Sequence, residues 1–341
     1  MRILVTANHA PFLHGGGERH VDNLCAALRA GGHEVALFRL PFKFQPESDI
    51  ARLMAFCDGY DLSAPNGQHV DRVISLQFPG YGMRHPLHVV WLMHQHRAVY
   101  ELFDAHAATP ALAALREDVV AYDRRTLANV ARRFANSRRV AERLQHDTGL
   151  DAAPLYHPPP DADALVCGEP WNYVVYPSRL ESLKRQDLLI EAARLLTCDV
   201  KILIGGEGGQ HERYQRLIER HDLGDRVRLI GGFSEAERIT LYAHALAVVF
   251  PPFDEDLGYV TLEAMYAGKP VVTCTDSGGP LEFVVPGETG EVVPPHAEAV
   301  AAAIDRLAAN PGRARDMGEA GRARIVGMGL SWERVIATLC A

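Results

Sequence analysis

The sequence predicts an α/β protein made of two doubly wound, Rossmann-like domains. Short apolar runs alternate with stretches of helical periodicity along most of the chain, as in βαβ units around a parallel sheet. The chain has 341 residues, which is too long for one ordinary hydrophobic core. At roughly 150 residues per domain, two domains are expected. A proline-rich segment at 157–172, HPPPDADALVCGEPWN, interrupts the alternation and is the predicted linker.

The predicted first domain opens with a strand at RILVTA, a loop at NHAPFLHGGG and a helix at ERHVDNLCAALRAGG. Its later strands are predicted at HEVALFRL, DRVISLQF, LHVVWLMH, RRFANS and APLYHP.

The predicted second domain has strands at YVVYPS, VKILIGG, RVRLIGG, LAVVFPP and KPVVTC, with helices at KRQDLLIEAARLL and SEAERITLYAHA between them. Residues 296–341 have helical periodicity, with breaks near Asn310-Pro311 and around 327–329. Two such domains facing one another leave a cleft at the carboxyl ends of their strands, where sheets of this kind bind ligands.

Charge and cysteine content exclude several classes of protein. The first 165 residues carry 17 Lys and Arg against 18 Asp and Glu, and the remainder carries 18 against 25. Neither part has the basic excess of a nucleic-acid-binding domain, so no nucleic-acid partner is expected. The six cysteines form no CxxC pair, which indicates reduced thiols in the cytoplasm. No signal-peptide pattern or apolar run of about 18 to 20 residues occurs, so the chain is expected to be neither secreted nor integral to a membrane.

The glycine-rich segments do not fit the common nucleotide-binding motifs. Gly15-Gly16-Gly17 follows a loop rather than a strand, and no Walker loop is present, so NAD and ATP chemistry lack sequence support. The glycine run still lies between a strand and a helix, where backbone N–H groups can approach an anion. A simple tight turn is the alternative interpretation.

A cation pair follows the first strand of the second domain, in SRLESLKRQ. Arg179 and Lys184 lie near the start of the next helix, where the helix dipole favours anions rather than cations. A bound polyanion would resolve this conflict. The alternative is a solvated charge cluster with Glu181 and Asp187.

Two glutamates lie eight positions apart in FDEDLGYVTLEAM. If a helix begins near Gly258, Glu255 lies in the preceding loop and Glu263 lies more than one turn inside the helix. Each carboxylate can then accept hydrogen bonds from hydroxyls, and the helix start between them can meet a phosphate. A sugar nucleotide has this arrangement of groups. The alternative is two solvated acids near a helix start.

Three blocks in order resemble one family. EDLGYVTLE, YPSRLESLKRQDLLIEA and HGGGERHVDNLCAALRAGGHEV are similar to the Glu-x7-Glu motif, the Arg-x4-Lys segment and the glycine loop of retaining glycosyltransferases of the GT-B fold, family 4, also called group 1. The resemblance implies an acceptor-binding domain at 1–160 and a nucleotide-sugar-binding domain at 161–325. It also implies a last helix at 326–341 that packs back on the first domain.

The resemblance also implies roles for individual residues. Arg179 and Lys184 would bind the donor diphosphate and offset charge on the leaving group. Donor contacts would come from Glu255 to the sugar hydroxyls, from the backbone at Leu257, Gly258 and Tyr259 to the sugar and phosphate, from Glu263 to the ribose, and from Gly16 and Gly17 to the diphosphate. His94 matches a family histidine near the reacting sugar. His96 makes a His-x-His pair with it, but the sequence offers no third metal ligand at suitable spacing.

The expected activity is retaining, metal-independent transfer of a hexose-type sugar from a nucleotide diphosphate to a hydroxyl acceptor, without a cofactor. The resemblance suggests bacterial-type polysaccharide, lipopolysaccharide or glycolipid assembly. The sequence leaves open the base (UDP, GDP or ADP), the sugar and the acceptor, a lipid-linked glycan being one candidate. A nucleotide-sugar epimerase of the same fold and a non-catalytic sugar-nucleotide-binding subunit are the alternative functions.

Seven arginines between 122 and 145, in YDRRTLANVARRFANSRRVAERLQ, suggest peripheral contact with acidic lipid headgroups at the inner membrane face. A solvated helix face is the alternative, because Asp123 and Glu142 dilute the positive charge.

Overall fold

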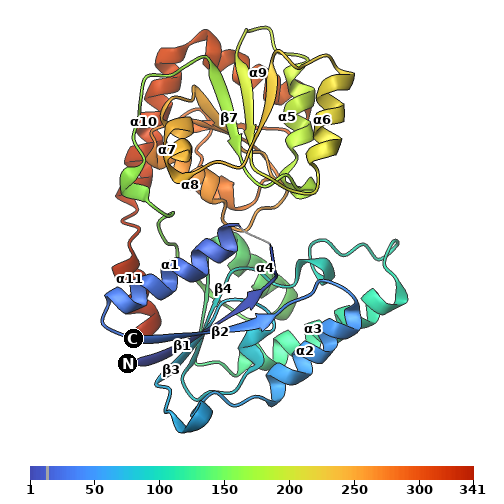
Figure 1. The fold of residues 1–341 in the computed structure, drawn as a ribbon, viewed down its shortest axis with the longest axis vertical. Helices are drawn as coiled ribbons and strands as arrows, with labels where there is room; N and C mark the ends of the chain where they lie inside the picture. The colour runs from blue at the N-terminus through green and yellow to red at the C-terminus, as the bar shows by residue number, and fades with distance from the viewer. Residues whose placement is uncertain (13–14) are drawn as a thin grey trace. The chain divides into compact units, whose positions relative to one another are not determined.

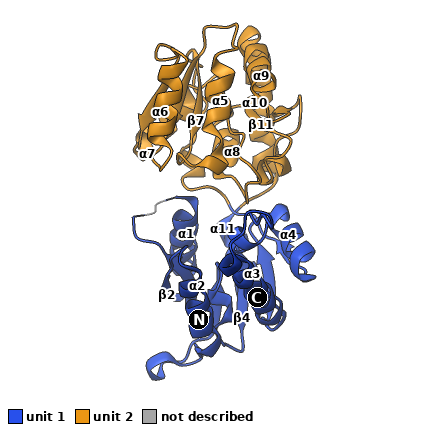
Figure 2. Ribbon diagram, turned by 90° about the vertical axis from the view of Figure 1, so that its right-hand side faces the viewer, with its two compact units in different colours: residues 1–157, 331–341 blue, residues 158–330 orange. Residues whose placement is uncertain are grey.

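The computed structural model describes residues 1–12 and 15–341, so Leu13 and His14 of the predicted glycine loop lie outside the described residues. The chain divides into two compact units (Figure 2). Unit 1 comprises residues 1–157 and 331–341, and unit 2 comprises residues 158–330. Within the described residues the strands form two six-stranded sheets in which every pairing between strands is parallel. The predicted α/β class with two Rossmann-like sheets is therefore confirmed.

Unit 1 has the strand order β2-β1-β3-β4-β5-β6 (Figure 1). Its strands are β1 (Arg2–His9), β2 (Glu34–Pro41), β3 (Arg72–Ser75), β4 (His88–Leu92), β5 (Arg132–Ala135) and β6 (Ala153–Pro154). Its α-helices are α1 (Gly16–Ala30), α2 (Glu47–Gly59), α3 (Pro110–Ala128), α4 (Arg138–Thr148) and α11 (Trp332–Cys340). Short 3-10 helices are η1 (Pro65–Gly67), η2 (Gly80–Gly82) and η3 (Arg97–Val99).

Helices cover both faces of the unit 1 sheet. Along β4, Trp91 packs with residues of α1 and α11, whereas its neighbour Leu92 packs with residues of α2, α3 and α4. Successive side chains of a strand point to opposite faces, so an apolar run without alternation, such as HVVWL, fits a strand buried on both sides.

The last helix, α11, completes the core of unit 1 beside α1 (Figure 1). Val335 and Leu339 are fully buried, and the Trp332 ring lies 6.2 Å from the Trp91 ring. Arg72 of β3 donates a hydrogen bond of 2.7 Å to the main-chain oxygen of Leu339. The last helix therefore packs on the first domain, as the resemblance implies.

Deleting residues 331–341 is expected to destabilise unit 1. Val335 and Leu339 alone contribute about 3 to 6 kcal/mol of burial, a large part of a typical domain's stability of about 5 to 15 kcal/mol. The melting temperature of the truncated chain measures the effect. Glu333→Ala on the exposed face of the same helix is the control, and an unchanged melting temperature on truncation would contradict the structural role of α11.

Unit 2 has the strand order β12-β11-β10-β7-β8-β9. Its strands are β7 (Tyr173–Pro177), β8 (Lys201–Gly205), β9 (Val227–Gly231), β10 (Ala247–Val249), β11 (Val271–Cys274) and β12 (Gly290–Val293). Its α-helices are α5 (Gln186–Ala193), α6 (His211–Arg220), α7 (Glu235–Ala243), α8 (Tyr259–Tyr266), α9 (Ala297–Ala309) and α10 (Pro311–Gly327). Short 3-10 helices are η4 (Ala162–Ala164), η5 (Ser182–Lys184) and η6 (Gly279–Glu282).

The unit boundaries differ slightly from those expected. The chain passes between units at His157/Pro158 and at Leu330/Ser331, rather than at 160/161 and 325/326. The second difference arises because α10 continues to Gly327, whereas α11 starts only after Ser331, whose hydroxyl accepts a hydrogen bond of 3.2 Å from the backbone N–H of Arg334. Residues 326–330 therefore belong to unit 2.

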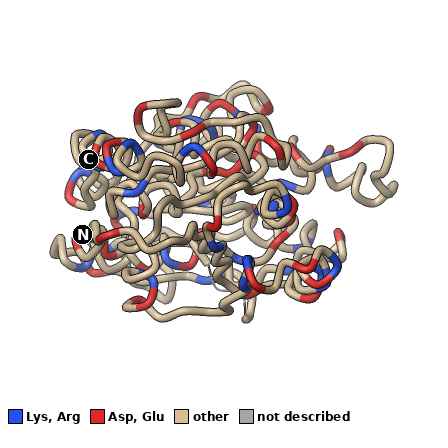
Figure 3. The backbone as a smooth tube through the Cα atoms, turned by 90° about the horizontal axis from the view of Figure 1, so that it is seen from above, with Lys and Arg blue, Asp and Glu red and all other residues tan. Residues whose placement is uncertain are grey.

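Basic and acidic residues are interspersed along the described chain (Figure 3). Many lie in ion pairs, among them Arg2 with Glu34, Arg39 with Glu18 and Arg306 with Glu291. The distribution agrees with the balanced charge of the sequence.

Candidate functional site

The strand order of unit 2 reverses between β7 and β10. The chain winds from β7 through β8 to β9 on one side, and then continues from β10 through β11 to β12 on the other. Open α/β sheets bind ligands at the carboxyl ends of the two strands that flank such a reversal. The loops that follow β7 and β10 carry Arg179, Lys184 and Glu255, so the structure brings these predicted residues to the position where a ligand is expected.

Lys184 and Glu255 form an ion pair across this reversal point, although they are 71 residues apart in the chain. Their side chains are only 17% and 16% exposed. The Lys184 ammonium also lies 5.7 Å from the centre of the Phe250 ring. The site thus holds a cation and a carboxylate side by side.

Arg179 lies in the same loop but is exposed. Within residues 1–12 and 15–341, its guanidinium makes no hydrogen bond or ion pair, while its main-chain oxygen accepts a bond of 2.8 Å from the buried Gln186 amide. The backbone at Arg179 is therefore fixed, and the charged group is left available for a ligand.

Arg185, which was not predicted as a site residue, links the loop after β7 to the loops after β10 and β11 by hydrogen bonds. Its guanidinium forms two hydrogen bonds, of 2.9 and 2.8 Å, with the Asp276 carboxylate after β11. It also donates to the main-chain oxygens of Pro251 and Pro252, at 2.8 and 2.6 Å, in the loop after β10. Because Arg185 directly follows Lys184, these four bonds hold the predicted cation next to the β10 loop.

The segment containing Glu255 is held by close backbone packing. Its N–H donates to Ser277 O at 2.9 Å, and its main-chain oxygen accepts from Gly279 N at 2.8 Å. A Cβ on Gly278 would lie 2.6 Å from the Glu255 oxygen, so only glycine allows this approach. The position of the Glu255 side chain thus depends on Gly278.

Helix α8 begins next to Glu255. Gly258 caps it with φ 82°, a left-handed conformation, and a Cβ there would lie 3.0 Å from Phe250. The first N–H groups of an α-helix have no partner within the helix, which makes this end suited to an anion. Leu257 is buried and Tyr259 half-buried on either side of Gly258.

Glu263, inside α8, is only 5% exposed. Arg238 donates to its Oε1 at 2.8 Å, and the Tyr242 hydroxyl donates to its Oε2 at 2.6 Å. Glu263 and Glu255 therefore have different environments, as the sequence predicts.

The predicted glycines of unit 1 lie at the equivalent position of the other sheet. The strand order reverses between β1 and β3, and Gly16 and Gly17 begin α1 just after β1. The ends of β1 and β3 are joined by Asn8, whose N–H donates to Gln77 Oε1 and whose side-chain amide donates to Phe78 O, both at 2.8 Å. Both glycines are exposed.

His94 and His96 follow β4 but have different surroundings. His94 is half-buried, and its Nδ1 lies 2.7 Å from Gln95 O. His96 is buried with its ring stacked on Phe78 at 5.3 Å, and burial lowers its pKa to about 4. His96 is therefore a neutral core residue, whereas His94 remains the candidate site residue.

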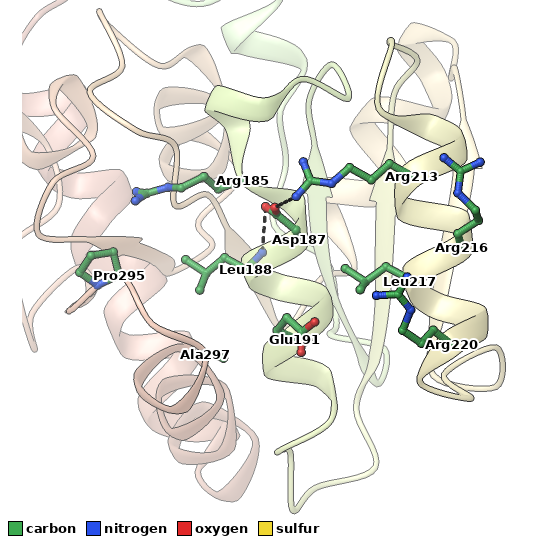
Figure 4. Close-up of a pocket in the computed structure, with 10 residues that line it drawn as sticks. All are labelled: Arg185, Asp187, Leu188, Glu191, Arg213, Arg216, Leu217, Arg220, Pro295 and Ala297. Atoms are coloured by element: carbon green, nitrogen blue, oxygen red, sulfur yellow. Dashed lines mark hydrogen bonds and ion pairs between the residues drawn. The ribbon is translucent and has the colours of Figure 1, made fainter. Parts of the chain in front are cut away.

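A separate groove of about 560 Å³ lies at α5, α6 and the start of α9 (Figure 4). Figure 4 shows Arg213 reaching from α6 to Asp187 on α5, an ion pair of 2.7 Å, while Arg216 extends on the outer side of α6. Glu191 in the groove already pairs with Arg194 and with His221. None of the predicted site residues lines the groove, and we assign it no ligand.

The arginines of 122–145 mostly have partners within unit 1. Arg125 pairs with Asp58, the buried Arg143 pairs with Glu101, and Arg133 donates to two main-chain oxygens. Such contacts favour a structural role for this part of the segment over a membrane-facing one. Among the described residues, no helix combines the length and apolar character needed to cross a bilayer.

Comparison with known proteins shows which family the second unit is similar to. The model of the family described as "Glycosyl transferases group 1" matches residues 163–324, which make up most of unit 2. This domain-length segment is similar to the group 1 glycosyl transferases. All the candidate residues of unit 2 lie within this domain, whereas Gly16, Gly17 and His94 of unit 1 lie outside the match.

The chain matches only part of the length of its curated relatives. Human Alpha-1,3/1,6-mannosyltransferase ALG2 is 32% identical over 164 residues, which is 43% of this chain and 39% of that protein. The alignments with ALG2 from Homo sapiens, Mus musculus and Dictyostelium discoideum span 28–39% of those proteins.

Two solved structures match almost the whole chain. Sucrose-phosphate synthase from Thermosynechococcus elongatus has a TM-score of 0.79 at 22% identity, covering 99% of this chain and 97% of that one. Anabaena Alr3699/HepE in complex with UDP-glucose has a TM-score of 0.75 at 18% identity, covering 100% and 98%. At these identities the likeness shows the fold alone, and it confirms the GT-B fold predicted from the sequence.

Proposed function

We propose that this chain is a retaining glycosyltransferase that moves a hexose-type sugar from a nucleoside diphosphate to a hydroxyl acceptor. The proposal rests on the Lys184–Glu255 ion pair, which lies where the strand order of unit 2 reverses. This part of the chain is the part that matches the group 1 glycosyl transferases. A cation for the diphosphate and a carboxylate for sugar hydroxyls are the two groups that binding such a donor requires.

In this proposal unit 2 binds the donor. Arg179 and Lys184 hold the diphosphate, and the α8 amino end adds backbone N–H groups. Glu255 accepts hydrogen bonds from the sugar, and Glu263 accepts them from the ribose.

Unit 1 supplies the remaining groups in this proposal. Gly16 and Gly17 meet the diphosphate through their backbone, because an exposed helix start without side chains allows close approach. His94 lies near the reacting sugar, and unit 1 binds the acceptor.

The proposed reaction uses no enzyme nucleophile. The bond from the sugar C1 to the phosphate oxygen breaks, and the acceptor oxygen forms a bond to C1 on the same face. The acceptor proton passes to the leaving diphosphate, whose charge Arg179 and Lys184 stabilise. Glu255 therefore orients the sugar and is not assigned as a base.

The names of similar proteins support a hexose donor, and one of them names a uridine nucleotide, but the choice of base is left to experiment. The Anabaena neighbour was solved with UDP-glucose, and ALG2 is named as a mannosyltransferase. A glycan acceptor in polysaccharide, lipopolysaccharide or glycolipid assembly remains a proposal, as does peripheral membrane contact by a cytoplasmic enzyme.

Thermal-shift titration of the full chain with UDP-, GDP- and ADP-sugars tests the proposal, because a ligand that binds the folded state raises its melting temperature. We expect one nucleotide series to stabilise the chain, and stabilisation by none of the three would contradict the proposal. Sugar interconversion without an acceptor would identify an epimerase. Binding without any donor turnover would identify a non-catalytic subunit.

Activity in excess EDTA is expected to equal activity in its absence. The charges of Arg179 and Lys184 provide the neutralisation that a divalent ion gives in other phosphate-transfer sites. The measurement is the initial rate of donor consumption with and without the chelator. Complete loss of activity, restored by Mn²⁺ or Mg²⁺, would contradict metal independence.

A further inference from the structure

Asp123 on α3 is a carboxylate inside the hydrophobic core of unit 1. It is fully buried, and each of its two oxygens accepts a hydrogen bond from a tyrosine. The Tyr81 hydroxyl donates to Oδ1 at 2.6 Å, and the Tyr100 hydroxyl donates to Oδ2 at 2.7 Å. Among the described residues no cation pairs with this carboxylate. Its ionised form therefore depends on the two tyrosine hydroxyls.

The two tyrosines come from the loops that follow β3 and β4. Tyr81 lies in η2, after β3, and Tyr100 directly follows η3, after β4. Both loops start at the carboxyl edge of the sheet, and β3 borders the reversal of strand order, where open α/β sheets bind ligands. His94 lies in the second of these loops. One buried carboxylate thus holds both loops on α3.

Further contacts show how closely the loops fit the helix. Tyr122 of α3 donates from its hydroxyl to Pro79 O at 2.7 Å, and a Cβ on Gly82 would lie 1.6 Å from that hydroxyl. The His96 ring stacks on the Phe78 ring at 5.3 Å, which joins the two loops to each other. Because the packing is close, a change in the hydrogen bonds beneath the loops is passed on to their positions.

We propose that Asp123 is a positioning residue for glycosyl transfer, whose ionised carboxylate holds the loops after β3 and β4 in the arrangement that supports turnover. The inference rests on the proposed function. Asp123 acts through the loops, since it is fully buried. A protonated carboxyl is a weaker acceptor and has a proton of its own to donate, so protonation weakens both tyrosine bonds.

The surroundings of Asp123 set the pH at which this change occurs. Burial raises the pKa of its carboxyl to about 7, although the hydrogen bonds from Tyr81 and Tyr100 act to lower it. The charge of Asp147 on α4 also raises this pKa. Asp123 is therefore expected to change its charge near neutral pH.

Other ionisable groups lie on the elements that pack against α3 or next to the tyrosines. Cys57 on α2 has its pKa raised to about 12 by burial, and burial lowers the pKa of His96 to about 4. The charged groups are paired: Asp58 with Arg125, Glu101 with Arg97 and Arg143, and Asp147 with His146. Variants of Asp123 and of its tyrosine partners leave all these groups in place, so a change in the pH profile reports on Asp123.

The pH dependence of turnover tests this role in the full chain. The nucleotide sugar selected by thermal-shift titration is the donor, and release of nucleoside diphosphate is measured from about pH 5.5 to about pH 8.5. We expect wild-type turnover to fall about tenfold per pH unit below about pH 7, as one ionisation gives. Asp123→Asn, which is neutral throughout, should lack this fall and be at least about tenfold slower than the wild type at about pH 8. Asp118→Asn on the exposed face of α3 is the matched control and should keep the wild-type profile.

Tyr100→Phe gives a second test, which decides the matter even if Asp123→Asn does not fold. This variant removes one of the two donors that lower the pKa of Asp123. The fall in turnover should therefore move to higher pH, by about one pH unit. A hydroxyl with a merely structural role would lower turnover equally at every pH and leave the midpoint unchanged.

Melting temperatures separate a loss of position from unfolding. Because its pKa is raised in the folded state, Asp123 contributes stability below about pH 4 that is lost as the pH rises through about 7. The melting temperature of the wild type minus that of Asp123→Asn should therefore be larger at about pH 6 than at about pH 8. Wild-type turnover should change in the opposite direction.

The affinity of Asp123→Asn for UDP, GDP and ADP should equal that of the wild type, because the proposed nucleotide contacts come from unit 2. A fall in turnover that persists unchanged in either Asp123→Asn or Tyr100→Phe would overturn the inference. Absence of turnover in the wild type with every nucleotide sugar would overturn the proposed function, and the inference with it.

Discussion

Replacing Lys184 or Arg179 by alanine is expected to lower donor turnover about 100-fold or more. Loss of one preorganised electrostatic contact to a developing negative charge has this effect in other enzymes. The Lys184 variant should be the more severe, because it also removes a cation that pairs with the Glu255 carboxylate beside the donor diphosphate. Steady-state rates of nucleoside diphosphate release measure both effects.

Arg220→Ala on α6 is the control for these variants, since it removes a cation of unit 2 outside the loops that follow β7 and β10. Its turnover should equal that of the wild type. Near-normal turnover in both Lys184→Ala and Arg179→Ala would rule out their assignment to the diphosphate.

Glutamine in place of Glu255 or of Glu263 is expected to produce two different defects. Glu255→Gln should lower the rate of the chemical step while leaving affinity for free nucleoside diphosphate unchanged or higher, because it frees Lys184 from its carboxylate partner. Glu263→Gln should weaken nucleotide binding by about tenfold, since it loses the ionised acceptor. Calorimetry and single-turnover rates separate the two effects.

Both substitutions keep the size of the side chain, so melting temperatures serve as the control for folding. Equal losses of nucleotide affinity in the two variants would contradict the division of roles between Glu255 and Glu263.

Strands buried on both faces were the most predictable part of the fold. Runs such as YVVYP and VVTC combine β-branched residues with flanking turn residues, and β7 and β11 lie there. The strand β12 was not predicted, because GEVV is short and follows the turn-like PGET. A Cβ on Gly290 would lie 2.1 Å from Val271 O, so pairing with β11, and not local preference, places this strand.

The part of the site that lies within one local sequence motif was predictable. Gly258, Leu257 and Glu263 are fixed by the start of α8, which the glycine marks in the sequence. The contacts of Arg185 and Arg238 were not predictable, because their main partners, Asp276 and Glu263, are 91 and 25 residues away. Only the strand order brings such residues together.

The central claim is that Arg179 and Lys184 bind the diphosphate of a nucleotide sugar. Calorimetric titration with a nucleoside diphosphate and its monophosphate tests it most directly, since their difference in affinity isolates the second phosphate. We expect the wild type to prefer the diphosphate by at least about tenfold, and the Arg179→Ala/Lys184→Ala double variant to bind both within about twofold. An unchanged preference in the double variant would show that other groups bind the second phosphate, which would contradict the proposed site.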